Sequence, residues 1–379
     1  MNFAFTEEQE FLRQTARRFL EDKSLSPTVR QLMETEAGFD RSTWSEIARM
    51  GWQGMHIPEA YGGAGFSYLE LIVLMEEMGR ALLPAPFLSS VCLAANALLV
   101  AGSEEQKQRY LPEIASGERT AALAFTEPNG RWDAAGVQLP AKRDGDHYLL
   151  SGTKLFVVDG HTADTLLVAA RTADTSDPEE GVSLFLVDSG APGVERRALG
   201  TMDMTRKQAE VTLDNVSVPA ESLLVEEGRA WPAISRVLDL AVVALAAEQV
   251  GGAQRCLEMS VDYAKARVQF GRPIGSFQAI KHKCADMLVQ VESARSAAYY
   301  AAWAAAEDNQ ELPLVAPLAK SYCSEAYFFV AAENIQVHGG IGFTWEHDAH
   351  LYFKRAKSSE LLFGDPAYHR ELLAQRIGL

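Results

Sequence analysis

This sequence of 379 residues has no paired cysteines, no long apolar run and no excess of basic charge. Its four cysteines lie far apart, without a CxxC pair or a Cys/His ligand spacing, so neither a disulfide scaffold nor a zinc site is expected. They are Cys92, Cys256, Cys284 and Cys323. The longest apolar run, Leu240–Ala247, is too short to span a bilayer. The opening residues, MNFAFTEEQEFL, are acidic and amphipathic rather than leader-like, and we therefore expect a cytoplasmic protein without a metal site.

Acidic side chains outnumber basic ones by 51 to 35, which gives a net charge of −16. A surface of this sign repels nucleic acid and anionic membranes. The stretch Ala264–Ala285 is different, because it contains basic side chains and no acid. Its cations are Lys265, Arg267, Arg272, Lys281 and Lys283. Such a segment favours an anionic partner such as a phosphate, and the alternative is a solvated helix end whose cations complement the helix dipole.

Hydrophobic periodicity divides the chain into three predicted domains. Residues 1–119 show helical spacing, residues 120–226 contain short β-rich runs separated by turn signals, and residues 227–379 show long helical stretches joined by short Gly/Pro loops. The last of these stretches is predicted to run as one helix from His350 to Gln375. The fold class is therefore α+β: an N-terminal helical domain, a central antiparallel β-barrel or sandwich, and a C-terminal four-helix bundle.

Four motifs in this order resemble those of the acyl-CoA dehydrogenase family. The segment from Arg267 to Gln278, RVQFGRPIGSFQ, resembles the family's RxxFGxxIxxFQ stretch. The other three begin at Gly51 (GWQG…IPEAYGGAG), Phe125 (FTEP) and Gln336 (QVHGGIGF). The resemblance covers almost the whole chain. It implies an FAD-dependent flavoprotein that converts acyl-CoA to trans-2-enoyl-CoA, passes electrons to an electron-transfer flavoprotein, and assembles as a homotetramer or an α2β2 heterotetramer.

The same resemblance implies the FAD contacts. Arg267 and Phe270 match residues that contact the FAD of a neighbouring subunit, with the arginine at the pyrophosphate, and Gln278 belongs to the same group. Gln336, Gly339 and Gly340 match the segment near the adenosine end, where glycines allow a close backbone approach. The residues that match strands beside the flavin ring are Phe125, Thr126, Phe156 and Val158.

The chain departs from the family pattern at several of these positions. Phe156-Val-Val158 replaces a Trp-Ile-Thr pattern whose threonine meets flavin N5, and Arg131-Trp132-Asp133 replaces a Gly-Ser-Asp that touches flavin and substrate. Trp132 is therefore expected either to shape the substrate cavity or to fill a packing gap. Most family members place the catalytic glutamate before a glycine of the last loop, where this chain has Phe363. A phenyl ring accepts no proton, but the backbone N–H of Phe363 can still bind the thioester carbonyl.

Two other carboxylates are candidates for the base that removes the Cα proton. Glu248 is the only charged residue in Leu240–Ala253, an apolar setting that favours a base. The alternative is an ion pair with a nearby arginine, such as Arg255, or a solvent-facing position at a subunit edge. Asp365 is the second candidate, and the alternative is an N-cap of the terminal helix. Asp239 matches a residue that touches the pantetheine arm in relatives, and a plain surface aspartate is equally consistent with the sequence.

The replaced base leaves other functions open. The chain resembles a bacterial branch that forms α2β2 assemblies on bulky substrates such as steroid side-chain CoA esters, so it is either a catalytic dehydrogenase of fatty-acid or steroid catabolism or a non-catalytic partner subunit. A flavin monooxygenase of the same fold is the third possibility. His282, His338 and His369 have no ligand or triad spacing and are expected to pack or to lie at the surface.

Overall fold

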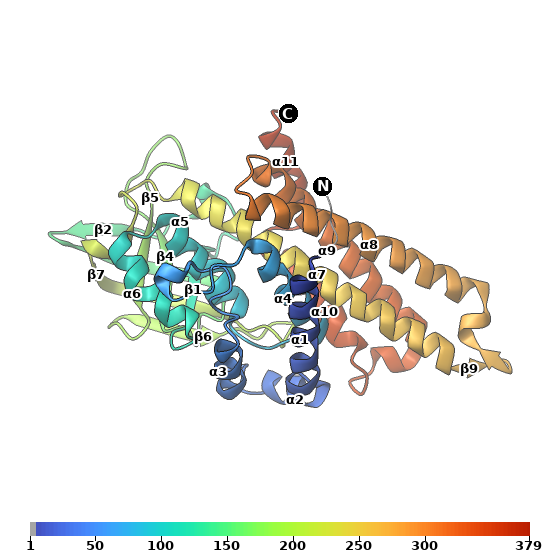
Figure 1. Ribbon diagram of the computed structural model, residues 1–379. Helices are drawn as coiled ribbons and strands as arrows, with labels where there is room; N and C mark the ends of the chain where they lie inside the picture. The colour runs from blue at the N-terminus through green and yellow to red at the C-terminus, as the bar shows by residue number, and fades with distance from the viewer. Residues whose placement is uncertain (1–4) are drawn as a thin grey trace. The chain divides into compact units, whose positions relative to one another are not determined.

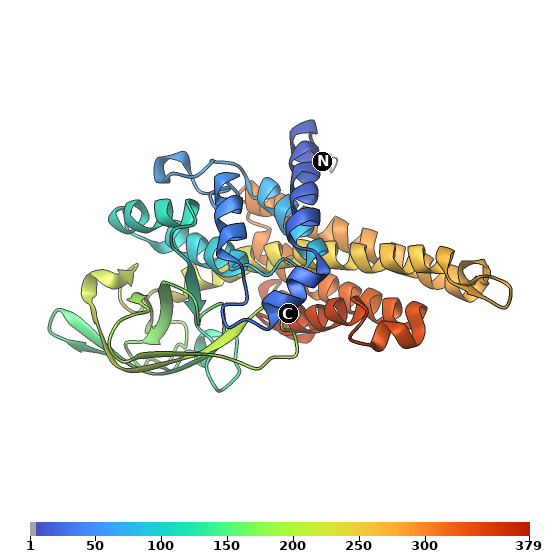
Figure 2. The ribbon, with the colours of Figure 1, turned by 90° about the horizontal axis from the view of Figure 1, so that it is seen from below.

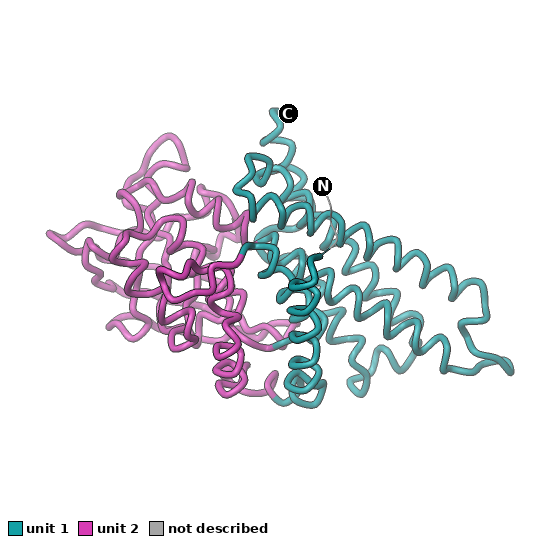
Figure 3. Tube along the Cα trace, viewed as in Figure 1, with its two compact units in different colours: residues 1–31, 67–83, 242–379 teal, residues 32–66, 84–241 magenta. Residues whose placement is uncertain are grey.

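The computed structural model describes residues 5–379. These residues form two compact units, coloured separately in Figure 3. The first unit contains residues up to 31, 67–83 and 242–379, and the second contains residues 32–66 and 84–241. The predicted division into 1–119, 120–226 and 227–379 follows secondary structure instead, and it stays a prediction about folding domains.

Helices make up both ends of the chain and strands its centre, as the sequence predicts (Figure 1). The α-helices are α1 (Glu7–Lys23), α2 (Ser26–Met33), α3 (Arg41–Arg49), α4 (Tyr68–Ala81), α5 (Asn96–Ala101), α6 (Glu104–Ala115), α7 (Trp231–Ala266), α8 (Gln278–Ala306), α9 (Leu312–His338), α10 (Ala349–Leu361) and α11 (Pro366–Arg376). The strands are β1 (Ala121–Ala124), β2 (Ala141–Asp144), β3 (His147–Val158), β4 (Thr165–Arg171), β5 (Val182–Asp188), β6 (Val194–Ala198), β7 (Gln208–Pro219), β8 (Leu223–Leu224), β9 (Val268–Gln269) and β10 (Arg272–Pro273). The α+β class with helical termini is confirmed.

The first unit is a helical bundle built around α9, which packs against α8, α10 and α11. Figures 1 and 2 both show α7 and α8 side by side, joined at their far end by the short β9–β10 hairpin. The predicted helix from His350 to Gln375 is wrong as a single element, because it ends at Leu361 and restarts at Pro366. Proline cannot continue a helix but is well suited to begin one, and Asp365 caps the new start.

Helices α4 and α7 cross at very short distance in this unit. A Cβ atom added to Gly79 would lie 2.0 Å from the carbonyl oxygen of Glu248, and one added to Gly251 would lie 1.8 Å from that of Glu76. The carboxylates of Glu76 and Glu77 on α4 are buried. Glu76 accepts hydrogen bonds from Arg13 (3.1 Å) and from Tyr299 (2.6 Å), so burial of this charge is offset by partners on α1 and α8.

The second unit contains two four-stranded sheets, with strand orders β1-β4-β5-β8 and β2-β3-β7-β6. Apolar side chains of both sheets share one core, as expected for a sandwich. One edge departs from the predicted antiparallel pattern, because β1 runs parallel to β4 with Ala121 opposite Thr165. The chain makes β2 and β3 of the other sheet between these two strands, and that long connection permits parallel pairing.

Strand β3 is one continuous strand of twelve residues. Its register against β7 shifts between Lys154 and Val157, which marks a β-bulge at this point. A buried π-helix from Leu88 to Ala95 is a further element that the sequence did not predict. Within residues 5–379, no helix combines the length and apolarity needed to cross a membrane.

Candidate active site

The predicted site residues are distributed over both units, and we describe each unit separately. The second unit holds Phe125, Thr126, Trp132, Phe156, Val158 and Asp239, and the first unit holds Glu248, Arg267, Phe270, Gln278, Gln336, Gly339, Gly340, Phe363 and Asp365.

In the second unit, the predicted flavin-side residues lie on neighbouring segments of β1 and β3. Phe125 and Thr126 directly follow β1, and the backbone N–H of Leu155 donates to the carbonyl of Thr126 at 2.9 Å. Phe156 lies at the bulge of β3 with a left-handed φ of 56° and a side chain 43% exposed, whereas Val158 is buried. A phenylalanine with positive φ is energetically costly and is maintained by its surroundings. The bulge therefore presents the Phe156 ring outward beside the end of β1.

A buried ion pair that the sequence interpretation missed lies against this segment. The ammonium of Lys154 lies 2.6 Å from Glu127 and also donates to the carbonyl of Phe125 at 3.3 Å. Glu127 in addition accepts the backbone N–H groups of Gln138 and Leu139, both at 2.9 Å. Burial lowers the pKa of Lys154 to about 8, against the opposing effect of Glu127. Because Lys154 also binds the carbonyl of Phe125, the pair restrains the chain at Phe125.

Trp132 and Asp239 are the predicted substrate contacts of this unit. Trp132 packs against Phe125, with ring centroids 5.9 Å apart. Asp239 is buried in α7, so the alternative of a plain surface aspartate does not hold. Their contact with substrate stays a prediction.

In the first unit, Arg267 and Phe270 occupy the β9–β10 hairpin. The hairpin is closed by the N–H of Ile274, which donates to the carbonyl of Arg267 at 2.8 Å. Phe270 has a φ of 54° and is 92% exposed. A large apolar ring held outward at a strained backbone position is typical of a residue that a ligand or another subunit covers. Arg267 is exposed beside it.

The segment at the end of α9 provides an open backbone. Gln336, Gly339 and Gly340 are exposed, and a Cβ atom added to either glycine would have no atom within 4 Å. Gln278, at the first turn of α8, is exposed as well. Cationic and aromatic side chains on the hairpin together with an accessible glycine backbone match what a flavin dinucleotide requires, so the residues present fit FAD.

Phe363 lies in the turn between α10 and α11. Leu362 has φ −66° and ψ 128°, Phe363 has a φ of 62°, and the N–H of Gly364 donates to the carbonyl of Leu361 at 3.3 Å. These values define a type II turn, whose third residue is usually glycine or asparagine. The structure therefore maintains a phenylalanine where the turn favours glycine, with its ring buried.

The two carboxylates proposed as bases each have a defined partner. Glu248 accepts a hydrogen bond from Arg355 of α10 at 3.0 Å, and both side chains are almost fully buried, 6% and 3% exposed. The suggested pairing with Arg255 is wrong, because Arg255 faces Glu258 at 3.6 Å instead. Asp365 is exposed and accepts the N–H of Tyr368 at 2.8 Å, so it is the N-cap that the alternative predicted. Both groups thus perform structural work, and a catalytic role for either stays a prediction.

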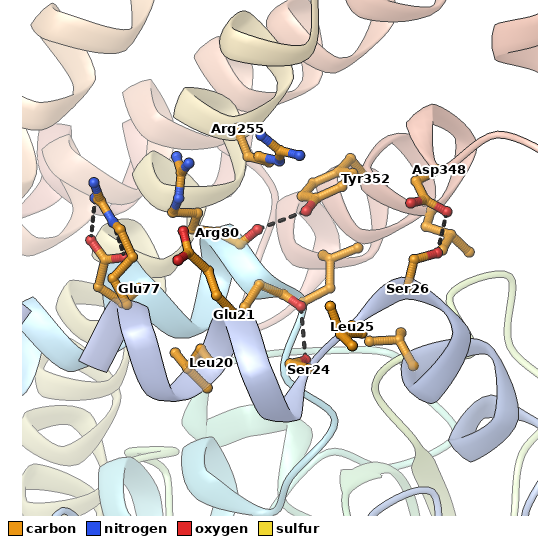
Figure 4. Close-up of a pocket in the computed structure, with 15 residues that line it drawn as sticks. Leu20, Glu21, Ser24, Leu25, Ser26, Glu77, Arg80, Arg255, Asp348 and Tyr352 are labelled. Atoms are coloured by element: carbon orange, nitrogen blue, oxygen red, sulfur yellow. Dashed lines mark hydrogen bonds and ion pairs between the residues drawn. The ribbon is translucent and has the colours of Figure 1, made fainter. Parts of the chain in front are cut away.

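A cavity of about 240 Å³ lies elsewhere in the first unit, between α1, α2, α4, α7 and α10 (Figure 4). Most of its charges have partners: Arg17 pairs with Glu77 at 2.7 Å, and the hydroxyl of Tyr352 donates to the carbonyl of Arg80 at 2.7 Å. None of the predicted site residues lines this cavity. It is therefore separate from the site that the sequence predicts.

Comparisons with known proteins show which family this chain resembles. Three family models match in order: the acyl-CoA dehydrogenase N-terminal domain over residues 6–118, the middle domain over 122–216 and the C-terminal domain over 228–378. The Bacillus subtilis (strain 168) protein named Probable acyl-CoA dehydrogenase YngJ is 33% identical, and the match covers 100% of both chains.

Two solved structures show the same fold. Butyryl-CoA dehydrogenase from Megasphaera elsdenii matches with a TM-score of 0.93 and 31% identity over 100% of both chains. A chain of the ChsE4–ChsE5 complex from Mycobacterium tuberculosis matches with a TM-score of 0.90 and 31% identity, covering 100% of this chain and 99% of that one.

Proposed function

The chain belongs to the acyl-CoA dehydrogenase family, and we propose that it dehydrogenates an acyl-CoA thioester to the trans-2-enoyl-CoA and passes the electrons to an electron-transfer flavoprotein. It is an FAD-dependent oxidoreductase that acts on a CH–CH group.

The observation that carries the proposal is the fixed turn at Phe363. When Cα loses its proton, negative charge develops on the thioester oxygen, and an N–H already pointing at that oxygen stabilises the charge without reorganisation. A backbone N–H needs no particular side chain. In the proposal, Phe363 therefore keeps the carbonyl-binding role of its position, although its ring cannot take a proton.

Bound FAD supplies the acceptor for the hydride that leaves Cβ. The chain's own contribution is to hold FAD. In the second unit, we assign the Phe125–Thr126 segment to the ring face. In the first unit, we assign Gly339 and Gly340 to the adenosine end and Arg267 to the pyrophosphate of the FAD in a neighbouring subunit. Arg267 is suited to this role because a guanidinium binds phosphate oxygens through paired hydrogen bonds. Trp132, which packs against Phe125, is proposed to limit the space beside the ring.

Removal of the Cα proton requires a carboxylate, and Glu248 is the proposed base. Arg355 lies 3.0 Å from this carboxylate and restrains its position. Asp365 is the weaker choice, because its carboxylate caps α11.

The side-chain chemistry and contacts of Phe363, Glu248 and Asp365 favour a second function. Phe363 accepts no proton, Glu248 is engaged with Arg355 and Asp365 with Tyr368. This combination is expected of a partner subunit in a heterotetramer, in which a sister chain supplies the base. The likeness to a chain of the two-protein ChsE4–ChsE5 complex supports the same possibility.

The two functions differ in what happens when a carboxylate is added at position 363. We compare wild type, Phe363→Glu and the matched control Phe363→Gln, each loaded with FAD, for acyl-CoA oxidation with electron-transfer flavoprotein as acceptor and enoyl-CoA as product. If the chain has its own base, the wild-type protein forms enoyl-CoA. If the chain is a partner subunit, wild type and Phe363→Gln form no enoyl-CoA above background, and Phe363→Glu raises the rate of enoyl-CoA formation roughly 100-fold or more over that background. Absence of enoyl-CoA formation in all three contradicts the first function.

A further inference from the structure

We propose that Lys320 and His369 are positioning residues that hold the Phe363 turn in the conformation that binds the thioester carbonyl. The inference rests on the proposed function, because it concerns the same backbone N–H. A left-handed φ is energetically costly for phenylalanine, so other groups must hold Phe363 in this turn.

Lys320 lies on α9 and is fully buried. Its ammonium donates to the carbonyls of Glu360 (2.9 Å) and Gly364 (3.2 Å) and to the hydroxyl of Ser324 (3.0 Å). Burial lowers the pKa of Lys320 to about 7, against the opposing effect of Glu360. Two of its three acceptors are carbonyls on either side of Phe363 in the chain, so a single side chain ties both ends of the turn to α9.

His369 lies in the first turns of α11 and is also buried. Its Nε2 is 3.1 Å from the carbonyl oxygen of Phe363. A carbonyl can only accept, so Nε2 carries the proton and donates it. Burial lowers the pKa of His369 to about 3, which keeps the ring neutral and in this donor form at ordinary pH.

Together the two side chains bind the carbonyl oxygens of residues 360, 363 and 364. The direction of the Phe363 N–H is set by ψ of Leu362 and φ of Phe363 together. A change of this φ toward negative values that ψ of Leu362 does not compensate would move the Phe363 carbonyl away from His369 and the next carbonyl away from Lys320. The clamp formed by Lys320 and His369 therefore maintains the orientation of this N–H.

The experiment uses the full FAD-loaded chain and acetoacetyl-CoA, whose Cα proton is already acidic and whose enolate is visible in the absorbance spectrum. The proton is released to solvent, so the readout needs neither turnover nor a base residue. His369→Leu removes the donor to Phe363, and His369→Gln replaces it with an amide N–H. His350→Leu is the control, because it removes a buried histidine of α10 outside the turn.

We expect about tenfold less bound enolate in His369→Leu than in wild type at the same pH, with recovery in His369→Gln and no change in His350→Leu. Wild-type enolate formation in His369→Leu, or an equal loss in His350→Leu, would overturn the clamp. A wild-type chain that retains FAD but forms no enolate would instead contradict the proposed function itself. The test uses His369→Leu and His369→Gln rather than Lys320→Met, because Lys320→Met leaves three hydrogen-bond acceptors unpaired and destabilises the fold.

Discussion

Position 363 shows how one residue can lose one function of its site and keep another. The phenyl ring cannot replace a carboxylate as a proton acceptor, but the peptide N–H of Phe363 depends only on the backbone conformation. That conformation has a left-handed φ of 62° and is held by two buried donors from other helices. At this scale, the main question is which carboxylate, if any, the chain itself offers to the Cα proton.

Glu248 is the residue whose two possible roles can be separated by substitution. Glu248→Gln leaves Arg355 buried without its charged partner and is expected to lower the free energy of unfolding by about 3–5 kcal/mol. The double variant Glu248→Gln/Arg355→Met removes both charges and should recover most of that loss, as measured by chemical denaturation.

The double variant then reports on the base. If Glu248 is the base, the double variant binds FAD but its flavin is reduced by acyl-CoA about 100-fold more slowly than in wild type. Arg355→Met alone, which retains the carboxylate, is the control for damage at the pair. Reduction at the wild-type rate in the double variant would remove Glu248 from the mechanism.

Among the elements, the crossing of α4 and α7 and the end of α9 use glycine for opposite reasons. Gly79 permits two backbones to touch, because a Cβ atom there would lie 2.0 Å from the carbonyl oxygen of Glu248. Gly340 faces open space. The first requirement comes from packing, and the second is proposed to come from the approach of FAD.

A glycine-to-alanine substitution is therefore expected to have different effects at positions 79 and 340. Gly79→Ala is expected to destabilise the chain by about 1–3 kcal/mol, because the helices must separate. Gly340→Ala should leave the unfolding midpoint unchanged and weaken FAD retention during dialysis. Gly200→Ala is the matched control, since Gly200 is also open to solvent but lies outside the predicted site. Loss of stability without loss of FAD in Gly340→Ala would contradict the assignment.

Element order and type were predictable from the sequence where periodicity is strong, as in α8 and α9 and in the strands of the central sandwich. The start of α11 had a local signal in Asp365-Pro366, which the sequence interpretation gave only as an alternative. The left-handed turn at Phe363 had none, because Lys320 is forty residues or more from the carbonyls it binds. The Glu127–Lys154 pair and the partner Arg355 of Glu248 were missed for the same reason. His369 was assigned to packing because a lone histidine carries no ligand or triad spacing.

On the scale of the whole molecule, the net charge of −16 conceals buried ionisable groups in both units. His56 in the second unit and His369 in the first are buried, and burial lowers their pKa to about 4 and about 3. In the unfolded chain the same side chains take up protons near their ordinary pKa of 6.5. Between these values the unfolded state binds more protons than the folded state.

The free energy of unfolding is therefore expected to fall as the pH drops below about 6.5, by about 1.4 kcal/mol per pH unit for each histidine. Urea unfolding at several pH values measures this slope. His369→Gln should remove the contribution of His369 to this slope. His282→Gln, at an exposed position, should leave the slope unchanged. A slope that is the same in wild type and His369→Gln would show that His369 is not the group that titrates.

An anaerobic titration of the purified holoprotein with a panel of acyl-CoAs, followed by the absorbance of oxidised flavin, tests whether this chain, loaded with FAD, oxidises an acyl-CoA thioester. We expect at least one acyl-CoA to bleach this absorbance, with recovery of the corresponding trans-2-enoyl-CoA. If the chain retains FAD while no acyl-CoA of the panel bleaches it, the proposed dehydrogenase activity is wrong.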